Sequence, residues 1–420
     1  MSQILSLSFV VFLLLMIGLK YWLAWRQVRY VAQHAGAVPG QFADRVGIDA
    51  HRKAAAYTIA KTRLALLETA VGAIVLIALT LLGGLQWIAD TLHEWIDGDY
   101  AFQLAVVATV VLLLAVVDLP FSWFRQFRIE QRFGFNRMTL RLWLIDLIKA
   151  SVIAVVLGLP LLAAVVGLMR SAGPLWWLYA WLLWVTFNAL VLVIYPTLIA
   201  PLFNRFEPLK DSGLADRIAA LLQRTGFASK GVFVMDGSRR SAHGNAYFTG
   251  LGRAKRIVFF DTLVDRLQPQ EIEAVLAHEL GHFKLKHIAK RMAVSFVASL
   301  VFLVLLGFLA EQSWFYIGLG VTPSLSGGNE GIALVLFMLV LPVFTFLFAP
   351  VASHLSRRHE FEADAFAARH ASAQDLVSAL VKLYEDNAST LTPDPIHSAF
   401  YDSHPPASLR VQRLVAAVQA

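Results

Sequence analysis

Long runs of hydrophobic positions dominate the chain, and shorter polar segments separate them. A helix needs about 20 apolar residues to cross the hydrocarbon core of a bilayer. Seven runs approach or exceed this length, and we expect them to form membrane-spanning helices: residues 4–25, 64–88, 101–124, 144–169, 175–203, 292–309 and 331–350. The fifth run contains Pro196 and Pro201, so we expect its helix to be bent or broken.

The two longest polar segments follow the fifth and the seventh runs. In the first of them, periodicity predicts a helix at 214–225 and strands at 231–235, 245–250 and 256–260, before Pro269 opens another helix. The second segment reads as helical, with a helix at 375–386. The predicted fold is an all-α polytopic membrane protein with a small β-sheet outside the bilayer.

Composition supports a membrane protein and excludes several kinds of site. Of the 420 residues, 58% are hydrophobic and only 15% are charged, which is too apolar for a soluble globular chain. No basic patch interleaved with aromatic residues indicates a nucleic-acid partner, despite the net charge of +7. The absence of cysteine excludes disulfides, thiol nucleophiles and cysteine metal sites.

The positive charges are unevenly distributed between the loops. Lys and Arg concentrate after the first and third runs, whereas residues 90–100 and 311–330 contain neither. The positive-inside rule therefore places the N-terminus outside and the basic loops in the cytoplasm. With seven crossings, both long polar segments lie on the cytoplasmic side.

A metal-binding pattern stands in the first polar segment. His278 and His282 lie four residues apart, so in a helix they share one face, with Glu279 beside them. This HExxH arrangement is typical of zinc proteases. A catalytic zinc takes a third protein ligand and keeps a position for water, so the rest of the site must come from elsewhere. The alternative is an amphipathic helix that contains two histidines by coincidence.

The second polar segment offers the third ligand. Glu360 would complete a two-histidine, one-glutamate site, and Asp364 would accept a proton from the far nitrogen of a liganding histidine. Glu362 and His359 compete with Glu360 for this role, and a solvated charged helix face is the alternative for the whole segment. Further on, His404 lies in a loop where it would donate to a developing oxyanion, unless it is a solvated or capping histidine.

Several separated segments resemble the integral-membrane M48 metalloproteases of the Ste24 type, the CAAX prenyl protease 1 family, over essentially the whole chain. The matching segments are RFGFN at 132–136, FN at 203–204, PL at 208–209, SAHGNAY at 241–247, HELGH at 278–282, SRRHEFEAD at 356–364 and SHP at 403–405. The resemblance implies seven helices that enclose an aqueous intramembrane chamber, with a metalloprotease site at its cytoplasmic end.

The resemblance also assigns roles to the metal-binding segments. It implies that His278, His282 and Glu360 bind one Zn²⁺ per chain and that Glu279 is the general base. Asp364 matches the carboxylate behind a zinc ligand. In the expected reaction, Glu279 takes a proton from water and delivers it to the leaving amine.

Four further residues are expected to contact the substrate or the transition state. Asn245 and His404 match such contacts in the family, and we expect Tyr247 and Arg357 to bind substrate as well. An edge strand beside the zinc helix would hold an extended peptide by main-chain pairing.

We therefore expect a membrane-embedded zinc endopeptidase that cleaves near the C-terminus of prenylated CAAX-type or other membrane-associated substrates. Its partners would be a peptide or protein, lipidated or not, and the lipid bilayer. Short loops and a C-terminus without a recognisable retention signal favour a bacterial inner membrane over the endoplasmic reticulum. The alternatives are a heat-shock-type protease of membrane-protein quality control and a seven-helix receptor or transporter with a structural metal site.

The expected organisation has four parts. Residues 1–203 would hold five transmembrane helices with their cytoplasmic loops, and residues 204–291 the cytoplasmic protease core with the HExxH helix. Residues 292–350 would hold transmembrane helices six and seven, and residues 351–420 a cytoplasmic helical segment that completes the zinc site.

Overall fold

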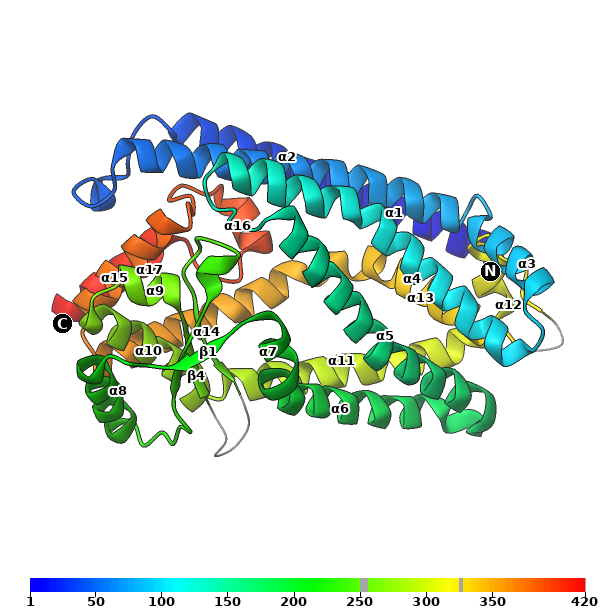
Figure 1. Cartoon of the computed structure of the whole chain (residues 1–420). Coiled ribbons are helices and arrows are strands. Elements are labelled where there is room, and N and C mark those ends of the chain that lie inside the picture. The colour runs from blue at the N-terminus through cyan, green and yellow to red at the C-terminus, as the bar shows by residue number, and fades with distance from the viewer. Residues whose placement is uncertain (250–255, 325–327, 420) are drawn as a thin grey trace.

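The structure is a computed structural model that describes residues 1–249, 256–324 and 328–419. Within these residues, seven helical segments are long and apolar enough to cross a membrane. They run along the length of the molecule, and the small sheet lies at one end together with the C-terminus, while the N-terminus lies at the other end (Figure 1). The predicted all-α membrane fold with a small sheet is confirmed.

The membrane-spanning segments are built mainly from α1 (Ser2–His34), α2 (Ile48–Leu79), α4 (Asp99–Phe124), α5 (Leu140–Ser171), α6 (Trp176–Ile194), α11 (His287–Ala310) and α13 (Glu330–Thr345). The fifth segment changes from α6 to a π-helical turn at Tyr195–Ile199 and then to the short α7 (Ala200–Phe203). Pro196 lies in the π-helical turn and Pro201 in α7, where we expected a bent or broken helix; the helix is irregular there but continues to Phe203.

The second span is shorter than its hydrophobic run. We expected it to extend to residue 88, but α2 ends at Leu79. Gly83 then adopts a φ of 76°, a left-handed conformation that favours glycine, and a separate amphipathic helix, α3 (Gly84–Trp95), begins. The hydrophobic pattern alone did not separate the two helices, because both contribute apolar residues to one continuous run.

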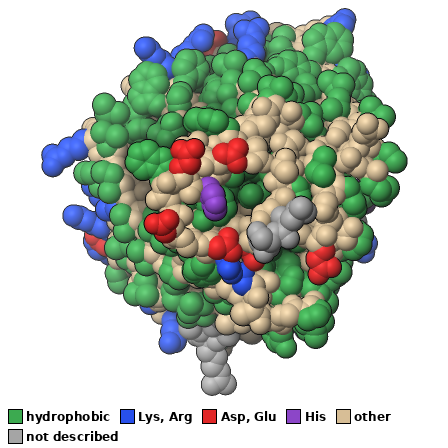
Figure 2. Space-filling model, turned by 90° about the vertical axis from the view of Figure 1, so that its right-hand side faces the viewer, with side chains coloured by type: hydrophobic (Ala, Val, Ile, Leu, Met, Phe, Trp, Pro, Cys, Tyr) green, Lys and Arg blue, Asp and Glu red, His purple; other side chains and the backbone are tan. Residues whose placement is uncertain are grey.

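The spans expose most of their apolar surface. In the most apolar window of the fifth span none of the residues is buried, and in the first and sixth spans only 11% are. Figure 2 shows the end of the molecule that carries the N-terminus, α3 and α12 (Ser313–Gly318). Apolar side chains cover much of this face, acidic side chains lie around its middle, and most Lys and Arg side chains lie at its rim. The exposed apolar residues along the spans themselves are suited to contact with lipid.

A four-stranded sheet and three helices follow the fifth span. Their bounds are β1 (Phe206–Pro208), α8 (Ser212–Arg224), β2 (Val232–Met235), β3 (Ala246–Thr249), β4 (Arg256–Phe260), α9 (Asp261–Arg266) and α10 (Pro269–Lys284). The strand order is β1-β2-β4-β3, so β3 is an edge strand, paired antiparallel to β4. The three predicted strands are confirmed, although Gly250 of the second one lies outside the described residues. The three-residue β1 was not predicted, because so short a strand leaves no periodic pattern.

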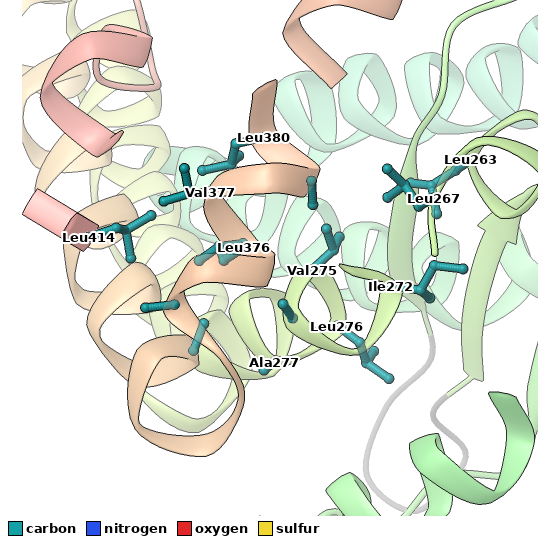
Figure 3. Packing of buried hydrophobic residues seen from close by; sticks show 14 of the residues in the cluster. Leu263, Leu267, Ile272, Val275, Leu276, Ala277, Leu376, Val377, Leu380 and Leu414 are labelled. Atoms are coloured by element: carbon teal, nitrogen blue, oxygen red, sulfur yellow. The ribbon is translucent and has the colours of Figure 1, made fainter. Parts of the chain in front are cut away.

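The last span continues without a loop into the end of the molecule that holds the HExxH helix α10. A 3-10 turn at Phe346–Phe348 joins α13 to α14 (Ala349–His370), and α15 (Ala373–Asp386), α16 (Pro395–Tyr401) and α17 (Ala407–Gln419) complete the chain. Helix α14 lies against α10 and brings its carboxylates to the HExxH helix. Figure 3 shows the core in which Val275 of α10 lies near Leu376 and Val377 of α15, whereas Leu276 points away from α15.

Residues 240–242, which lead into β3, are held by contacts with residues 135–137 and with Asp146. The backbone N–H of Ala242 donates to the carbonyl of Phe135 at 3.0 Å, and that of Arg137 donates to the carbonyl of Arg240 at 3.1 Å. The Arg240 guanidinium donates twice to the Asp146 carboxylate, at 2.8 and 3.0 Å. The segment that leads into β3 is therefore tied to residues 135–137 and to α5, the helix that follows them.

Candidate metal centre

The HExxH helix α10 is anchored at its first turn. Pro269 occupies an early helical position, where its missing N–H costs no hydrogen bond. The carboxylate of Glu271 accepts from the backbone N–H of Gln268 at 2.8 Å, and it also accepts from Ser378 and Lys382 of α15 at 2.6 and 2.8 Å. The helix is thus fixed against α15 about two turns before His278.

The structure brings together the three side chains predicted as metal ligands. The Nε2 atoms of His278 and His282 lie 3.2 Å apart. The Oε1 atom of Glu360 lies 3.2 Å from Nε2 of His282, and its Oε2 atom lies 3.5 Å from Nε2 of His278. One ligand atom from each residue lies within 4.8 Å of the other two, so they have the spacing of a metal site.

The carboxylate of Glu360 fits a bound cation. Its Oε2 atom is fully buried and accepts no hydrogen bond from the residues that the structure describes. A buried carboxylate oxygen that accepts no hydrogen bond is costly, because burial removes the water that would stabilise its charge. A divalent metal ion among two imidazole nitrogens and this oxygen would supply the missing partner. The donor set therefore fits the metal that the HExxH pattern predicts.

A buried ion pair supports His278 from behind. Oδ1 of Asp364 lies 2.8 Å from Nδ1 of His278, and Arg410 of α17 donates to both Asp364 oxygens, at 2.6 and 2.9 Å. Burial lowers the pKa of His278, but hydrogen bonds to Asp364 and Glu360 outweigh this effect and raise its pKa to about 9. The Asp364 carboxylate thus holds the far nitrogen of His278, as the sequence predicts.

Arg410 was missed by the sequence reasoning. It lies 46 residues after Asp364, in a helix that carries no recognisable motif. One signal was present: Arg410 shares the buried face of α17 with Ala407, Val411 and Leu414. A charged residue on an otherwise apolar helical stripe is rarely buried unless it is paired.

Glu279, Asn245 and His404 line one cavity of about 230 Å³ beside the metal site. The cavity lies between α10 and the start of the edge strand β3, and His278 and Arg410 contribute to its wall. Burial raises the pKa of the Glu279 carboxyl above its ordinary value. A carboxylate with a raised pKa, in a cavity next to a metal site, is suited to proton transfer near neutral pH.

His404 approaches the metal site from the solvent side. Its Nε2 atom lies 3.5 Å from Oε2 of Glu360, and Nδ1 lies 3.0 Å from the Ser403 hydroxyl. Arg357 does not line this cavity; it donates to the backbone carbonyls of Ser398 and Asp402, at 3.2 and 2.8 Å. Arg357 therefore holds the segment that leads to His404.

Tyr247 also lies away from this cavity. Its hydroxyl points to the sulfur of Met235, 3.8 Å away, and its ring packs edge to face against Phe260. Burial raises the pKa of Tyr247 to about 12. Asn245 and Tyr247 are close in sequence, but of the two only Asn245 reaches the cavity.

Gly281 permits the close contact between the two helices that carry the ligands. A Cβ atom at this position would lie 3.0 Å from Cα of Ala363 and 3.1 Å from Cβ of Phe366. Both neighbours are part of α14, and Ala363 lies between Glu360 and Asp364 in its sequence. The glycine within HELGH therefore has a packing role that the metal-binding pattern did not reveal.

Comparison with known proteins identifies related chains. A family model described as CAAX prenyl protease N-terminal, five membrane helices, matches residues 27–205, and one described as peptidase family M48 matches residues 208–418. The CAAX prenyl protease 1 homolog of Arabidopsis thaliana is 38% identical over 76% of this chain and 74% of its own length. CAAX prenyl protease 1 of Saccharomyces cerevisiae is 37% identical over 75% of this chain and 72% of its own length. The crystal structure of S. mikatae Ste24p superimposes with a TM-score of 0.90 at 29% identity, covering 98% of this chain and 99% of that one.

Proposed function

The chain belongs to peptidase family M48 and is a membrane-embedded metalloendopeptidase, and from this premise we propose that it uses zinc to cleave prenylated CAAX-type substrates near their C-terminus. The predicted family resemblance and enzyme class are confirmed. The observation that carries the proposal is the convergence of His278, His282 and Glu360 around a buried carboxylate oxygen without a hydrogen bond among the described residues. The comparisons do not favour a quality-control protease, a receptor or a transporter.

In this proposal, His278, His282 and Glu360 hold one zinc ion per chain. Two neutral imidazoles and one carboxylate are a donor set of known catalytic zinc sites. When bound, zinc would supply a Lewis acid that polarises the scissile carbonyl and makes water a better nucleophile. The buried pair of Asp364 and Arg410 keeps His278 oriented for this task.

Glu279 is the proposed general base. It takes a proton from the attacking water and delivers the proton to the amine that leaves when the peptide bond breaks. Its position in the cavity next to His278, and a pKa that burial raises, support both steps. His404 borders the same cavity, and we propose that its Nε2–H donates to the oxyanion that forms at the carbonyl.

The edge strand β3 is the proposed site of substrate pairing. Among the residues that the structure describes, β3 pairs only with β4, and we propose that its other backbone edge pairs with an extended peptide. Asn245, at the start of this strand, would contact the peptide beside Glu279. We propose that Tyr247 and Arg357 support substrate binding indirectly. Tyr247 is part of β3, and Arg357 holds the segment that leads to His404.

A second cavity supports a lipidated substrate. It has a volume of about 740 Å³ and lies between α1, α2, α13 and α16, with Leu64, Leu339 and Val343 among its apolar lining residues. Its lining includes His397 and Tyr401 of α16, the helix that precedes His404. We propose that an apolar chain attached near the cleaved bond occupies this cavity, whose lining also includes the charged Lys20, Lys61, Glu68 and Arg125.

The basic loops support an orientation with the active site on the cytoplasmic side and the N-terminus outside. We propose a bacterial inner membrane as the compartment, and the four parts with boundaries at 203, 291 and 350 as the organisation. In the structure, only the 3-10 turn at Phe346–Phe348 separates the last span from α14, so the third and fourth parts follow each other without a loop.

A product analysis tests the substrate class. Purified protein in detergent is incubated with a farnesylated peptide that ends in a CAAX sequence, with the same peptide without farnesyl, and with an unfolded membrane protein. We expect mass spectrometry to show that the farnesylated peptide is cleaved near its C-terminus faster than the other two substrates are cleaved. We expect no cleavage by Glu279→Gln. Faster degradation of the unfolded protein would favour a quality-control protease instead.

A further inference from the structure

A second imidazole backs His282. Nδ1 of His282 lies 3.1 Å from Nδ1 of His287, and Nε2 of His287 lies 3.0 Å from Oε2 of Glu362. The other Glu362 oxygen accepts from Nε of Arg358 at 3.1 Å. His287 is fully buried, so this chain of contacts lies inside the protein until it reaches Glu362.

The backbone places His287 by a tight turn. Helix α10 ends at Lys284, and α11 begins at His287. Lys286, between them, has a φ of 58°, a left-handed conformation that costs a residue with a Cβ atom free energy. The turn brings His287 back onto His282, five residues earlier, and the ring of His359 stacks on His287 with centroids 4.1 Å apart. The His287 ring is therefore held on one face by His359 and at both nitrogens by His282 and Glu362.

The positions of the protons follow from the contacts, on the premise that the proposed metal site is right. If Nε2 of His282 binds zinc, its proton lies on Nδ1 and is donated to the lone pair on Nδ1 of His287. The single proton of neutral His287 then lies on Nε2, where it is donated to Glu362. Each atom in this path has one role, and no donor faces another donor.

The same count decides between two uses of this cluster. In the part of the chain that the structure describes, His287, His359 and Glu362 also lie close enough together to hold a metal ion. An ion on Nε2 of His287 would leave that ring without a proton while Nδ1 accepts from His282, which requires an imidazolate anion. The contact with His282 therefore argues for a hydrogen-bonded path instead of a second metal site.

We propose that His287 is a positioning residue for the zinc site: it fixes the tautomer and orientation of His282 and connects it to the carboxylate of Glu362. The two zinc-binding histidines are thus supported differently. His278 is held directly by Asp364, whereas His282 is held through a neutral imidazole. Partners of this kind affect metal affinity by about 10- to 100-fold when they are removed.

Three substitutions of one residue test the proposal. His287→Asn keeps an oxygen near the position of Nδ1 and can still accept from His282. His287→Gln places its amide near Nε2, where it can reach Glu362 but not His282. His287→Leu removes both contacts. The measurement is the rate at which the full-length protein in detergent releases zinc to a chelator, together with the absorption spectrum of its cobalt-substituted form.

We expect His287→Leu and His287→Gln to release zinc about 10- to 100-fold faster than wild type, with a changed cobalt spectrum, and His287→Asn to stay much closer to wild type. A merely structural role would not separate Asn from Gln. Equal zinc release by all three variants and wild type would overturn the proposal, as would two zinc ions per wild-type chain that fall to one in His359→Leu.

A change at the other end of the path covers the case in which the His287 variants do not fold. Glu362→Ala should release zinc faster than Glu362→Gln, because Gln keeps an acceptor for Nε2–H; identical wild-type rates for both would also overturn the proposal. Failure of the proposed function looks different. In that case wild type binds no zinc, or His278→Ala binds it as tightly as wild type does.

Discussion

The end of the molecule that holds α10, α14 and α17 buries many of its residues and an ion pair, whereas the membrane-spanning helices bury fewer of their residues. Ten of the 16 residues of α10 are buried, whereas none is buried in the most apolar window of the fifth span. The paired side chains of Asp364 and Arg410 are 4% and 6% exposed. In the ion pair at the other end of the molecule, the side chains of Asp99 and Arg170 are 49% and 32% exposed. Water cannot replace a partner lost from a buried pair. We therefore infer that the metal site depends on the buried pair of Asp364 and Arg410.

The largest expected difference comes from removing one arginine at each end. Arg410→Met leaves the Asp364 carboxylate buried with His278 but without its arginine, and we expect it to lower the free energy of unfolding by about 3 to 5 kcal/mol. Arg170→Met breaks an exposed pair and should cost only about 0 to 1 kcal/mol. Thermal unfolding of both variants in the same detergent measures the difference. Similar losses in both would show that burial does not distinguish the two regions.

Two glycine substitutions sharpen the same comparison with a smaller effect. In Gly281→Ala the new methyl group meets α14 at 3.0 Å, and such overpacking should cost about 1 to 3 kcal/mol. In Gly158→Ala, within α5, the methyl group meets no atom within 4 Å, so stability should change by less than about 1 kcal/mol. Gly281→Ala should also release zinc faster, because Ala363 shares its helix with Glu360. An unchanged zinc-release rate would contradict this account of Gly281.

The smallest expected effect is at the contact between the two regions. Asp394 caps α16 and accepts from Arg26 of α1, at 2.8 and 3.2 Å. Burial raises the pKa of Asp394, but Arg26 and two backbone N–H groups outweigh burial and hold the pKa below its usual value. A lowered pKa means that this stabilisation is present above the unfolded pKa, about 3.9, and is lost as pH falls through the folded value.

Asp394→Asn tests that pH dependence. Wild type should lose on the order of 1 kcal/mol more stability than the variant when the pH falls from neutral to below about 3.9. Unfolding midpoints of both proteins at several pH values provide the measurement. Parallel curves would show that the pair with Arg26 does not contribute.

Most of the correct predictions came from local sequence patterns. The HELGH segment predicts its own helix and face, and the apolar runs predict the spans, because both depend on residues near each other in sequence. Glu360 was within reach for the same reason: its segment repeats carboxylates at helical spacing. The three proposed ligands could therefore be predicted from the sequence without knowledge of any tertiary contact.

The features that were missed depend on contacts between distant elements. Arg410 meets Asp364 only because α17 folds against α14, and Gly281 matters only because α14 passes so close to α10. His287 follows the zinc motif by five residues, but its contact with His282 needs the left-handed turn at Lys286. Sequence spacing does not reveal such turns when the residue is not glycine.

The central claim is that His278, His282 and Glu360 hold one zinc ion and that Glu279 moves the proton. The most direct test measures zinc content and peptide cleavage together for wild type, Glu360→Ala and Glu279→Gln. We predict one zinc per chain in wild type and in Glu279→Gln, with cleavage by the latter reduced at least about 10²- to 10⁴-fold, and loss of zinc from Glu360→Ala. Full zinc content in Glu360→Ala, or wild-type cleavage by Glu279→Gln, would contradict the claim.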